Sequence, residues 1–265
     1  MKILVTGGAG YLGAEVCRQA LAAGHDVLAT KLRAEPPHGQ VVEVDLRDDE
    51  AVQRVLMKHG PELVVHTAYR QADDALQGDV VRASRNVALA SHRAGARLVH
   101  VSTDLVFDGE VGAPYDEDAE PRPVSAYGQA KLDAERLVRG LHPEALIVRT
   151  SLLYGLPEPG PQERLALLAE TPFYADEIRS PINAGDLAGA LLELGPRDDV
   201  PRLLHVAGPD AMSRYVLARR LRAVHGRDPD DVTGAPTPRG RARNVELDSG
   251  RAYALLQTHI RHLRG

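Results

Sequence analysis

Apolar and polar positions along the first 150 residues alternate in a way that predicts strands and helices in turn. Short runs rich in β-branched residues are typical of buried strands, and the stretches between them place apolar residues at helical spacing. The predicted strands are residues 2–6, 26–30, 41–44, 62–67, 97–102 and 145–150. The predicted helices between them are residues 11–23, 49–59, 80–94 and 125–140. This alternation indicates βαβ units, so we expect an α/β fold with a doubly wound parallel sheet.

The pattern becomes less regular after residue 150. The prolines that interrupt it are Pro157, Pro159, Pro161 and Pro172. The later predicted elements are helices at residues 185–194 and 213–225, a short strand at 203–206, and a surface loop rich in Pro, Gly and Arg at 228–241. We therefore expect a first domain over residues 1–150. Residues 151–265 are expected to form mostly a small C-terminal lobe, with one segment that returns to the core.

The composition is that of a soluble globular protein, with 43% hydrophobic and 26% charged residues among 265. No apolar run approaches the roughly 18 residues that cross a bilayer. The N-terminal apolar run is shorter than the roughly 7–15 residues of a secretory signal. The single cysteine, Cys17, cannot form an internal disulfide, in agreement with a reducing compartment. We expect a cytoplasmic protein without a membrane partner, and the pI near 6.1 argues against nucleic acid.

Three glycines, Gly7, Gly10 and Gly13, stand between the first predicted strand and the first predicted helix. Glycine is needed there because the turn requires backbone angles that side chains disfavour. The backbone must also approach a pyrophosphate closely, and the helix must pack closely on the sheet. The phosphates would bind free N–H groups at the N-terminus of the helix, which begins with Tyr11 and Leu12. This placement favours a dinucleotide-binding Rossmann fold over a purely structural turn.

The ends of the next three predicted strands carry further candidates for the cofactor site. Lys31 and Arg33 follow the second strand, where an acidic residue usually binds the adenosine ribose. Two cations there favour a 2′-phosphate, and therefore NADPH, with NADH as the alternative cofactor; they could also be solvated surface charges. The residues expected near the adenine are Asp45 and Leu46, and those expected near the pyrophosphate and riboses are Thr67, Ala68 and Tyr69.

Tyr127 and Lys131 are four residues apart on a predicted helix, and Thr103 follows the strand before it. Residues at this spacing share a helix face, and a nearby ammonium lowers the pKa of a phenol so that it exchanges a proton near neutral pH. Lysine is rare in this chain, since 28 of the 32 basic residues are arginine, so the pairing is not expected by chance. Ligands of open α/β sheets bind at the carboxyl ends of strands, which allows Thr103 to bond the same substrate oxygen.

Together these motifs resemble those of the extended short-chain dehydrogenases/reductases, and more narrowly those of the dTDP-4-dehydrorhamnose reductase branch. The segments that carry the resemblance are residues 6–13, 101–109, 115–117, 127–135 and 149–155, together with Pro121. Residues 241–248, RARNVELD, are similar to a late RPxNSxLD element of that branch. The similarity is specific over residues 1–190 and weaker from there to residue 265.

The resemblance implies an NADPH-dependent oxidoreductase that reduces a ketone of a sugar nucleotide, typically a 4-keto-6-deoxy sugar. Tyr127 would donate the proton, Lys131 would lower the Tyr pKa and hold the nicotinamide ribose, and Thr103 would polarise the carbonyl. The candidate substrate-binding residues are Asp104, Val106, Phe107, Arg239, Arg241 and Asn244. Residues 212–265 carry 11 Arg against 5 acidic residues, so the arginines near 241 either meet the nucleotide diphosphate or form a solvated loop. No metal site is predicted, and a homodimer is left open.

Departures from the branch keep two alternatives open. Family members usually have Asn where this chain has His66, and the Asn that usually organises a water near the catalytic Lys is missing at Asp79-Val80. One alternative is a sugar-nucleotide epimerase or dehydratase with a bound, cycling NAD(P), although the acidic pair that a dehydratase uses is not present beside Thr103. The other is a non-catalytic NADP-binding regulatory subunit, like that of methionine adenosyltransferase. The three retained catalytic candidates favour an enzyme.

Overall fold

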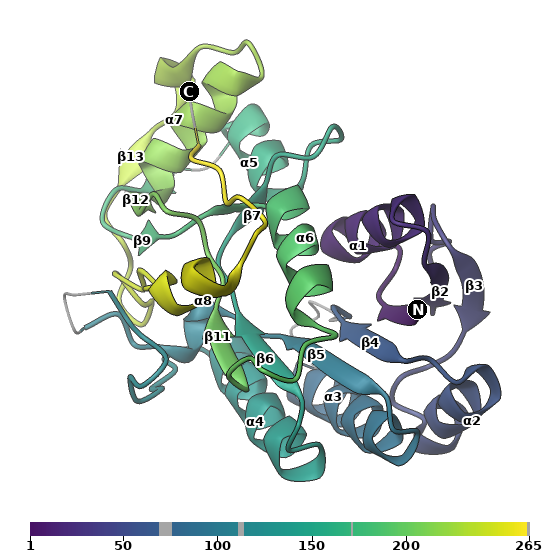
Figure 1. Ribbon diagram of the computed structural model, residues 1–265. Helices are drawn as coiled ribbons and strands as arrows, with labels where there is room; N and C mark the ends of the chain where they lie inside the picture. Colours follow the sequence, from purple (N-terminus) through teal and green to yellow (C-terminus); the bar gives the residue numbers. More distant parts are fainter. Residues whose placement is uncertain (69–75, 111–113, 171, 264–265) are drawn as a thin grey trace.

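A parallel sheet forms the centre of the molecule (Figure 1). The computed structural model describes residues 1–68, 76–110, 114–170 and 172–263. Within these ranges the main sheet has seven strands in the order β11-β6-β5-β4-β1-β2-β3, and every neighbouring pair is parallel. The strands are β1 (Lys2–Thr6), β2 (Asp26–Lys31), β3 (Gln40–Glu43), β4 (Leu63–His66), β5 (Arg97–Val101), β6 (Leu146–Arg149) and β11 (Leu203–His205). The predicted doubly wound parallel sheet is confirmed.

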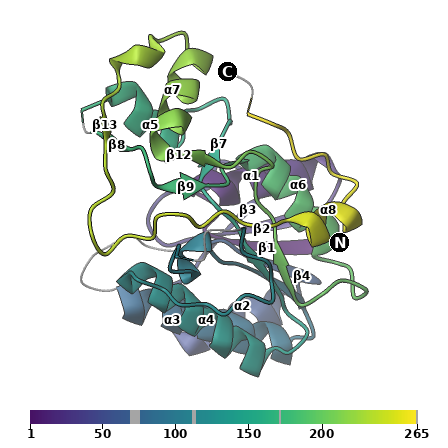
Figure 2. The ribbon, with the colours of Figure 1, turned by 90° about the vertical axis from the view of Figure 1, so that its left-hand side faces the viewer.

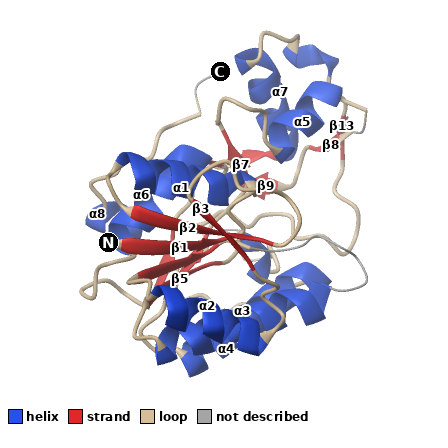
Figure 3. Ribbon diagram, turned by 90° about the vertical axis from the view of Figure 1, so that its right-hand side faces the viewer, coloured by secondary structure: helices blue, strands red, loops and turns tan. Residues whose placement is uncertain are grey.

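Helices cover both faces of this sheet, as Figures 2 and 3 show. The helices on one face are α1 (Tyr11–Ala22), α6 (Ala184–Leu194) and α8 (Gly250–Leu255). The helices on the other face are α2 (Asp49–His59), α3 (Leu76–Arg93) and α4 (Ala126–Leu141). The central strands are therefore covered from two sides, and β4 is buried along its whole length. Among the described residues, no helix is long and apolar enough to cross a membrane.

The ends of α2 illustrate how local sequence sets the elements. The Asp48 side chain caps the helix by accepting a hydrogen bond from the N–H of Ala51 at 3.0 Å. Acidic residues occupy the first turn and basic residues the last, which complements the helix dipole. Gly60 then ends the helix in the left-handed conformation, with a φ of 56°. These signals explain why the predicted bounds of this helix agree with the structure.

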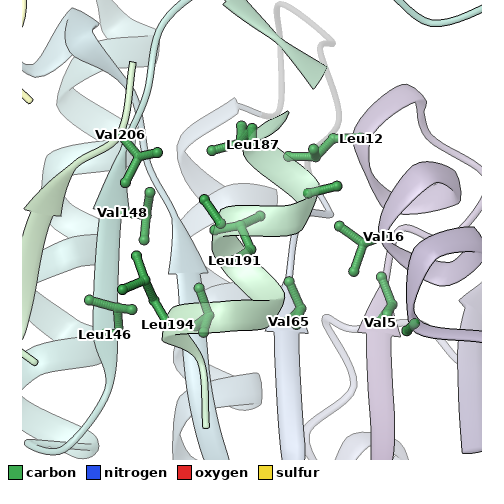
Figure 4. Close-up of a cluster of buried hydrophobic side chains, with 14 of the residues drawn as sticks. Val5, Leu12, Val16, Val65, Leu146, Val148, Leu187, Leu191, Leu194 and Val206 are labelled. Carbon is green, nitrogen blue, oxygen red and sulfur yellow. The ribbon is translucent and has the colours of Figure 1, made fainter. Parts of the chain in front are cut away.

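The core between the sheet and α1 and α6 is closely packed and apolar (Figure 4). Val5 of β1 and Val65 of β4 meet Val16 of α1, and Leu187 and Leu191 of α6 cover them; all five side chains are 0% exposed. Burying such a side chain contributes about 1.5–3 kcal/mol. Because α6 follows residue 150 in the sequence, this core joins the second part of the chain to the first.

A smaller lobe packs beside the main sheet, at the top of Figure 1. Its helical elements are α5 (Pro161–Leu168), α7 (Arg214–Val224) and the 3₁₀ turn η2 (Pro229–Asp231). Its short paired strands are β7 (Leu153–Tyr154) with β10 (Ile182–Asn183), β9 (Ile178–Arg179) with β12 (Met212–Ser213), and β8 (Phe173–Tyr174) with β13 (Gly234–Ala235). Phe173, Leu217 and Leu221 belong to the apolar cluster of this lobe.

Three parts of the second half differ from the sequence prediction. α5 lies where prolines predicted an interrupted chain. Pro161 is instead the first residue of the helix, where a missing N–H costs no hydrogen bond. The predicted loop at residues 228–241 contains η2 and β13, and the short helix α8 was not predicted. Elements of only two to six residues carry too little periodicity to be recognised from sequence.

Candidate active site

A cavity of about 980 Å³ lies between the carboxyl ends of the main-sheet strands and the smaller lobe. Its walls come from the β1–α1 loop, from residues that follow β3, β4, β5 and β6, from the first turns of α4 and α5, and from residues 240–242. The strand order reverses between β1 and β4. Loops diverge at such a point, and this is where open α/β sheets bind their ligands.

The loop between β1 and α1 fits a phosphate-bearing ligand. Gly7 has a φ of 71°, and a Cβ there would lie 2.8 Å from the Cα of Ala68. A Cβ on Gly13 would lie 2.2 Å from the carbonyl oxygen of Gly7 and would force the helix away from the loop. Among the described residues, no side chain caps α1 at Gly10 and no acidic residue occupies its first turn, so its N–H groups are available to an anion. The predicted phosphate-loop residues that line the cavity are Gly7, Gly10, Tyr11, Leu12 and Gly13.

Tyr11 connects this loop with the smaller lobe. Its hydroxyl accepts a hydrogen bond from the N–H of Leu156 at 3.0 Å and donates to Oε1 of Glu163 at 3.4 Å. The Glu163 carboxylate is buried and also accepts from the N–H groups of Gly155 at 2.6 Å and Gly160 at 3.0 Å. A Cβ on Gly160 would lie 2.5 Å from Cζ of Tyr11, so the ring packs directly on the lobe backbone. Burial raises the pKa of Tyr11 to about 12, which keeps the phenol neutral.

Residues after β3 and β4 form the side of the cavity predicted for adenosine. The predicted residues that line it are Asp45, Leu46, Thr67 and Ala68, while Tyr69 lies outside the described residues. Asn86 of α3 donates from Nδ2 to the carbonyl oxygen of Leu46 at 3.1 Å and holds this loop. Arg47, which the sequence analysis missed, also lines the cavity. It binds Asp45 at 2.6 Å and Asp79 at 3.3 Å, and its guanidinium lowers the pKa of Asp45. Its position two residues after Asp45 is the signal that could have identified it.

The two cations predicted to bind a 2′-phosphate lie beside the cavity rather than in its wall. The described residues that line it include Leu32 and neither Lys31 nor Arg33. Lys31 forms an ion pair with Glu35, which raises the lysine pKa, and Arg33 is exposed to solvent. Contact of Lys31 with a ligand in the cavity would require its side chain to leave Glu35, and Arg33 would have to turn its exposed side chain toward the cavity.

Thr103, Tyr127 and Lys131, which the sequence analysis assigned to one site, all line the cavity. Lys131 donates from Nζ to the backbone oxygen of Val101 at 2.6 Å, and only 5% of the residue is exposed. Burial lowers the pKa of Lys131 to about 8, and the carboxylate of Glu135 opposes this shift. Lys131 is therefore still mostly protonated at neutral pH, although its burial disfavours the charged form.

The first turn of α4 is fixed at the cavity wall. Ser125 caps the helix by accepting a hydrogen bond from the N–H of Gly128 at 3.1 Å. A Cβ on Gly128 would lie 2.1 Å from the carbonyl oxygen of Leu105. Glycine therefore allows α4 to pack against the 3₁₀ turn η1 (Asp104–Val106). This contact sets the separation between the helix that carries Tyr127 and the turn that follows Thr103.

A buried ion pair anchors α4 to the ends of β5 and β6. Arg149 donates from Nη2 and Nε to the Glu135 carboxylate at 2.7 and 3.0 Å, and the two side chains are 3% and 4% exposed. Ser102 donates from Oγ to the same carboxylate at 2.5 Å. The Arg149 guanidinium also lies over the ring of Phe107, 5.1 Å from its centroid. These bonds hold the helical turn that follows Lys131.

Two buried histidines lie side by side on β4 and β5. His66 and His100 are partners in the strand register, with ring centroids 5.3 Å apart. His66 makes hydrogen bonds through Nδ1 to Oγ1 of Thr6 at 2.7 Å and through Nε2 to Oγ of Ser84 at 3.2 Å. Burial, followed by the charge of Lys131, lowers the pKa of His66 to about 3 and that of His100 far below its usual range. His66, where family members usually have Asn, therefore has a structural role: its neutral side chain bonds Thr6 and so links β4 to β1.

The predicted substrate-binding residues fall into two groups. Those that line the cavity are Asp104 and Arg241, and those outside the described lining are Val106, Phe107, Arg239 and Asn244. Val106 and Phe107 are fully buried, and Phe107 stacks on Tyr115 with centroids 4.2 Å apart. They support the site from within the core and offer a ligand no surface. Polar cavity-lining residues that the sequence analysis did not assign to the site include Ser151, which lies in the recognised segment 149–155, and Gln162, Arg179 and Arg214, which lie in segments without a recognised motif. The described part of the chain contains no cluster of three or more His, Cys, Asp or Glu residues that could hold a metal ion.

Comparisons with known proteins agree with this geometry. The family model described as the RmlD substrate binding domain matches residues 1–265. A dTDP-4-dehydrorhamnose reductase of Mycobacterium tuberculosis is 33% identical, over 99% of this chain and 90% of that protein. The methionine adenosyltransferase 2 subunit beta of Xenopus laevis is 28% identical, over 93% of this chain and 80% of that protein. The crystal structure of dTDP-4-dehydrorhamnose reductase from Bacillus anthracis in complex with NADP has a TM-score of 0.82 and 25% identity, over 99% and 95% of the two chains. The chain therefore belongs to the RmlD substrate binding domain family.

Proposed function

We propose that this protein is an NADPH-dependent reductase that converts a ketone of a nucleotide-linked sugar, typically a 4-keto-6-deoxy sugar, into an alcohol. The observation that carries the proposal is that the glycine loop lines the same cavity as Thr103, Tyr127 and Lys131. The reductase from Mycobacterium tuberculosis supports the reaction, and the NADP complex of the Bacillus anthracis reductase supports the cofactor.

The cavity offers a place for each part of the cofactor. The glycine loop and the N-terminus of α1 would hold the diphosphate, Asp45 and Leu46 the adenosine, and Lys131 the nicotinamide ribose. When bound there, NADPH supplies a hydride to the ketone carbon. Thr67 and Ala68 are proposed to contact the middle of the cofactor, since both line the cavity after β4.

The protein's own groups then complete the reduction at the ketone oxygen. Tyr127 donates its phenolic proton to that oxygen, which becomes the hydroxyl of the product. Lys131 is charged at neutral pH, and its ammonium stabilises the phenolate that remains. Thr103 has one hydroxyl proton and donates it to Oδ1 of Asp104 at 3.1 Å. To bond the ketone oxygen, this hydroxyl must turn from Asp104 toward the substrate.

Turnover of the purified protein tests the proposal. NADPH absorbance should fall when a 4-keto-6-deoxy sugar nucleotide is added. Tyr127→Phe should abolish this turnover and leave NADPH binding intact, whereas Tyr215→Phe, in the smaller lobe, should keep both. Failure of the wild type across a panel of keto-sugar nucleotides, with NADPH still bound, would contradict the proposal and favour a regulatory subunit. Conversion of a sugar nucleotide without net NADPH consumption would favour an epimerase or dehydratase.

The proposal also includes the cytoplasm as the location of this activity, and it leaves open a homodimer. Light scattering of the purified chain distinguishes a homodimer from a monomer.

A further inference from the structure

Lys131 and Glu135 lie one turn apart on α4 and both bind the end of β5. Nζ of Lys131 donates to the backbone oxygen of Val101 at 2.6 Å. Oγ of Ser102, the next residue, donates to Oε1 of Glu135 at 2.5 Å. The two α4 residues are 5% and 3% exposed. A buried ammonium and a buried carboxylate are therefore fixed beside successive residues of one segment.

The Glu135 carboxylate is bonded by Arg149 and acts on Lys131 through space. Arg149 donates from Nε to both of its oxygens, at 3.0 and 3.2 Å, and from Nη2 to Oε2 at 2.7 Å. Side chains four residues apart on a helix face each other, with about 5–6 Å between their Cβ atoms. Water screens a buried pair of charges at this range much less than an exposed pair. The carboxylate therefore favours the charged form of the lysine, even though it bonds a different cation.

Two histidines of the sheet lie close enough to Lys131 for its charge to affect them. His66 and His100 are buried, and burial followed by the Lys131 charge lowers both of their pKa values. Both rings are therefore neutral at neutral pH and add no charge that would oppose or favour the ammonium. Tyr127, one turn earlier on α4, is the group on which the ammonium is proposed to act.

The acidic side chains that share the cavity wall with Lys131 are paired with arginines. These pairs are Asp45 and Asp79 with Arg47, and Asp104 with Arg179. In the described part of the chain, Glu135 is the residue whose charge raises the pKa of Lys131 against the effect of burial. The protonation of this lysine therefore depends on one carboxylate outside the cavity wall.

We propose that Glu135 is a positioning residue that keeps Lys131 protonated at neutral pH. The inference rests on the proposed function, because Glu135 acts on the reaction only through Lys131. With a pKa of about 8, Lys131 has little margin before it loses its proton near neutral pH. Without the Glu135 charge, a large share of the lysine would be neutral, and the phenolate of Tyr127 would lose the cation that stabilises it.

An NMR titration of the full chain, labelled with carbon-13 at lysine, measures this effect without turnover. The chain has four lysines, and Lys131→Met identifies the signals of Lys131. In the wild type these signals should titrate with a pKa of about 8. Glu135→Gln should lower this pKa by about 1 or more, because an opposite charge close to the ammonium is lost.

The sign of the change separates an electrostatic role from a merely structural one. If the ion pair only held α4 in place, its loss would admit water to Lys131 and raise the lysine pKa toward its ordinary value. Arg149→Gln removes a positive charge and should raise the pKa of Lys131, opposite to Glu135→Gln. Asp133→Asn is the matched control, because Asp133 lies on another face of α4 and its side chain is 34% exposed. It should change the pKa of Lys131 by less than about 0.3.

The pH profile of turnover extends the test to the reaction. Activity that requires a charged Lys131 falls on the basic side of the profile as the lysine loses its proton. In Glu135→Gln this fall should occur at lower pH than in the wild type, by the same amount as the lysine pKa measured by NMR. Asp133→Asn should keep the wild-type profile.

A Lys131 pKa in Glu135→Gln equal to or above that of the wild type would overturn the inference. A lower pKa in a protein that reduces no keto-sugar nucleotide would refute the proposed function and keep the charge coupling. If Glu135→Gln does not fold, Glu135→Leu/Arg149→Met replaces it, because apolar replacement of a whole buried pair is often neutral or stabilising. This double variant should also lower the pKa of Lys131, and an unchanged or higher value would again contradict the inference.

Discussion

The buried pair of Arg149 and Glu135 allows a sharp test of what holds α4, the helix that carries Tyr127 and Lys131, in place. Arg149→Met would leave the Glu135 carboxylate buried, with the Ser102 hydroxyl still bonded to it at 2.5 Å. Removing one partner of a buried ion pair costs about 3–5 kcal/mol, because an uncompensated charge remains. In a chain of this size about 1 kcal/mol corresponds to a Tm change of roughly 2–4 °C, so the Tm should fall by about 6–20 °C.

Thermal unfolding of the wild type, both single variants and Glu135→Leu/Arg149→Met measures the coupling as a double-mutant cycle. The double variant removes both charges, and apolar replacement of a buried pair is often neutral or stabilising, so it should regain most of the lost stability. Arg54→Met is the control, since its exposed pair with Glu50 should contribute less than about 1 kcal/mol. A double variant with a Tm at or below that of Arg149→Met would refute the reasoning.

Three further predictions concern the proposed cofactor side of the cavity and the buried Lys131. Gly13→Ala would place a Cβ 2.2 Å from the carbonyl oxygen of Gly7, so the Kd for NADP⁺ should rise at least about tenfold in a fluorescence titration. Gly140→Ala is the control: the space around Gly140 is open, and the Kd for NADP⁺ should stay unchanged. The pKa of Lys131 is lowered from 10.5 to about 8, so the folded protein binds fewer protons than the unfolded chain between these pH values. Wild-type stability should therefore rise relative to Lys131→Met from pH 8 to 10.5 in urea unfolding, and a constant difference would contradict this. Because Arg47 lines the cavity, Arg47→Ala should reduce the preference for NADPH over NADH, measured as the ratio of the two binding affinities, whereas Lys31→Ala should leave this ratio unchanged. The opposite result would indicate that Lys31, not Arg47, binds the 2′-phosphate.

The main sheet could be predicted because its signals are local. β4 is buried at every position, and the three residues before His66 form an apolar run that is typical of a central parallel strand. α2 carries its own cap at Asp48 and its own end at Gly60. The glycine loop and the pairing of Tyr127 with Lys131 are also short-range patterns, and both line the cavity.

The rest depends on contacts between distant segments. Glu177 and Arg241 are 64 residues apart and meet only because β9 pairs with two other segments. No local pattern indicates such a pair. Lys31 was expected to face a ligand, but Glu35, four residues later, offers a competing partner. Pro161 is ambiguous in sequence, since proline both interrupts helices and begins them.

The contact between the Tyr11 ring and the backbone of Gly160 has a thermodynamic consequence. The glycine loop and the cover of the smaller lobe share this one side chain, so neither can change position without affecting the other. If a ligand at the loop shifts Tyr11, the shift also changes the contacts of Tyr11 with Leu156 and Gly160, and with them the free energy of binding a second ligand at the smaller lobe. Linkage is reciprocal: if the first ligand changes the affinity for the second by some factor, the second changes the affinity for the first by the same factor.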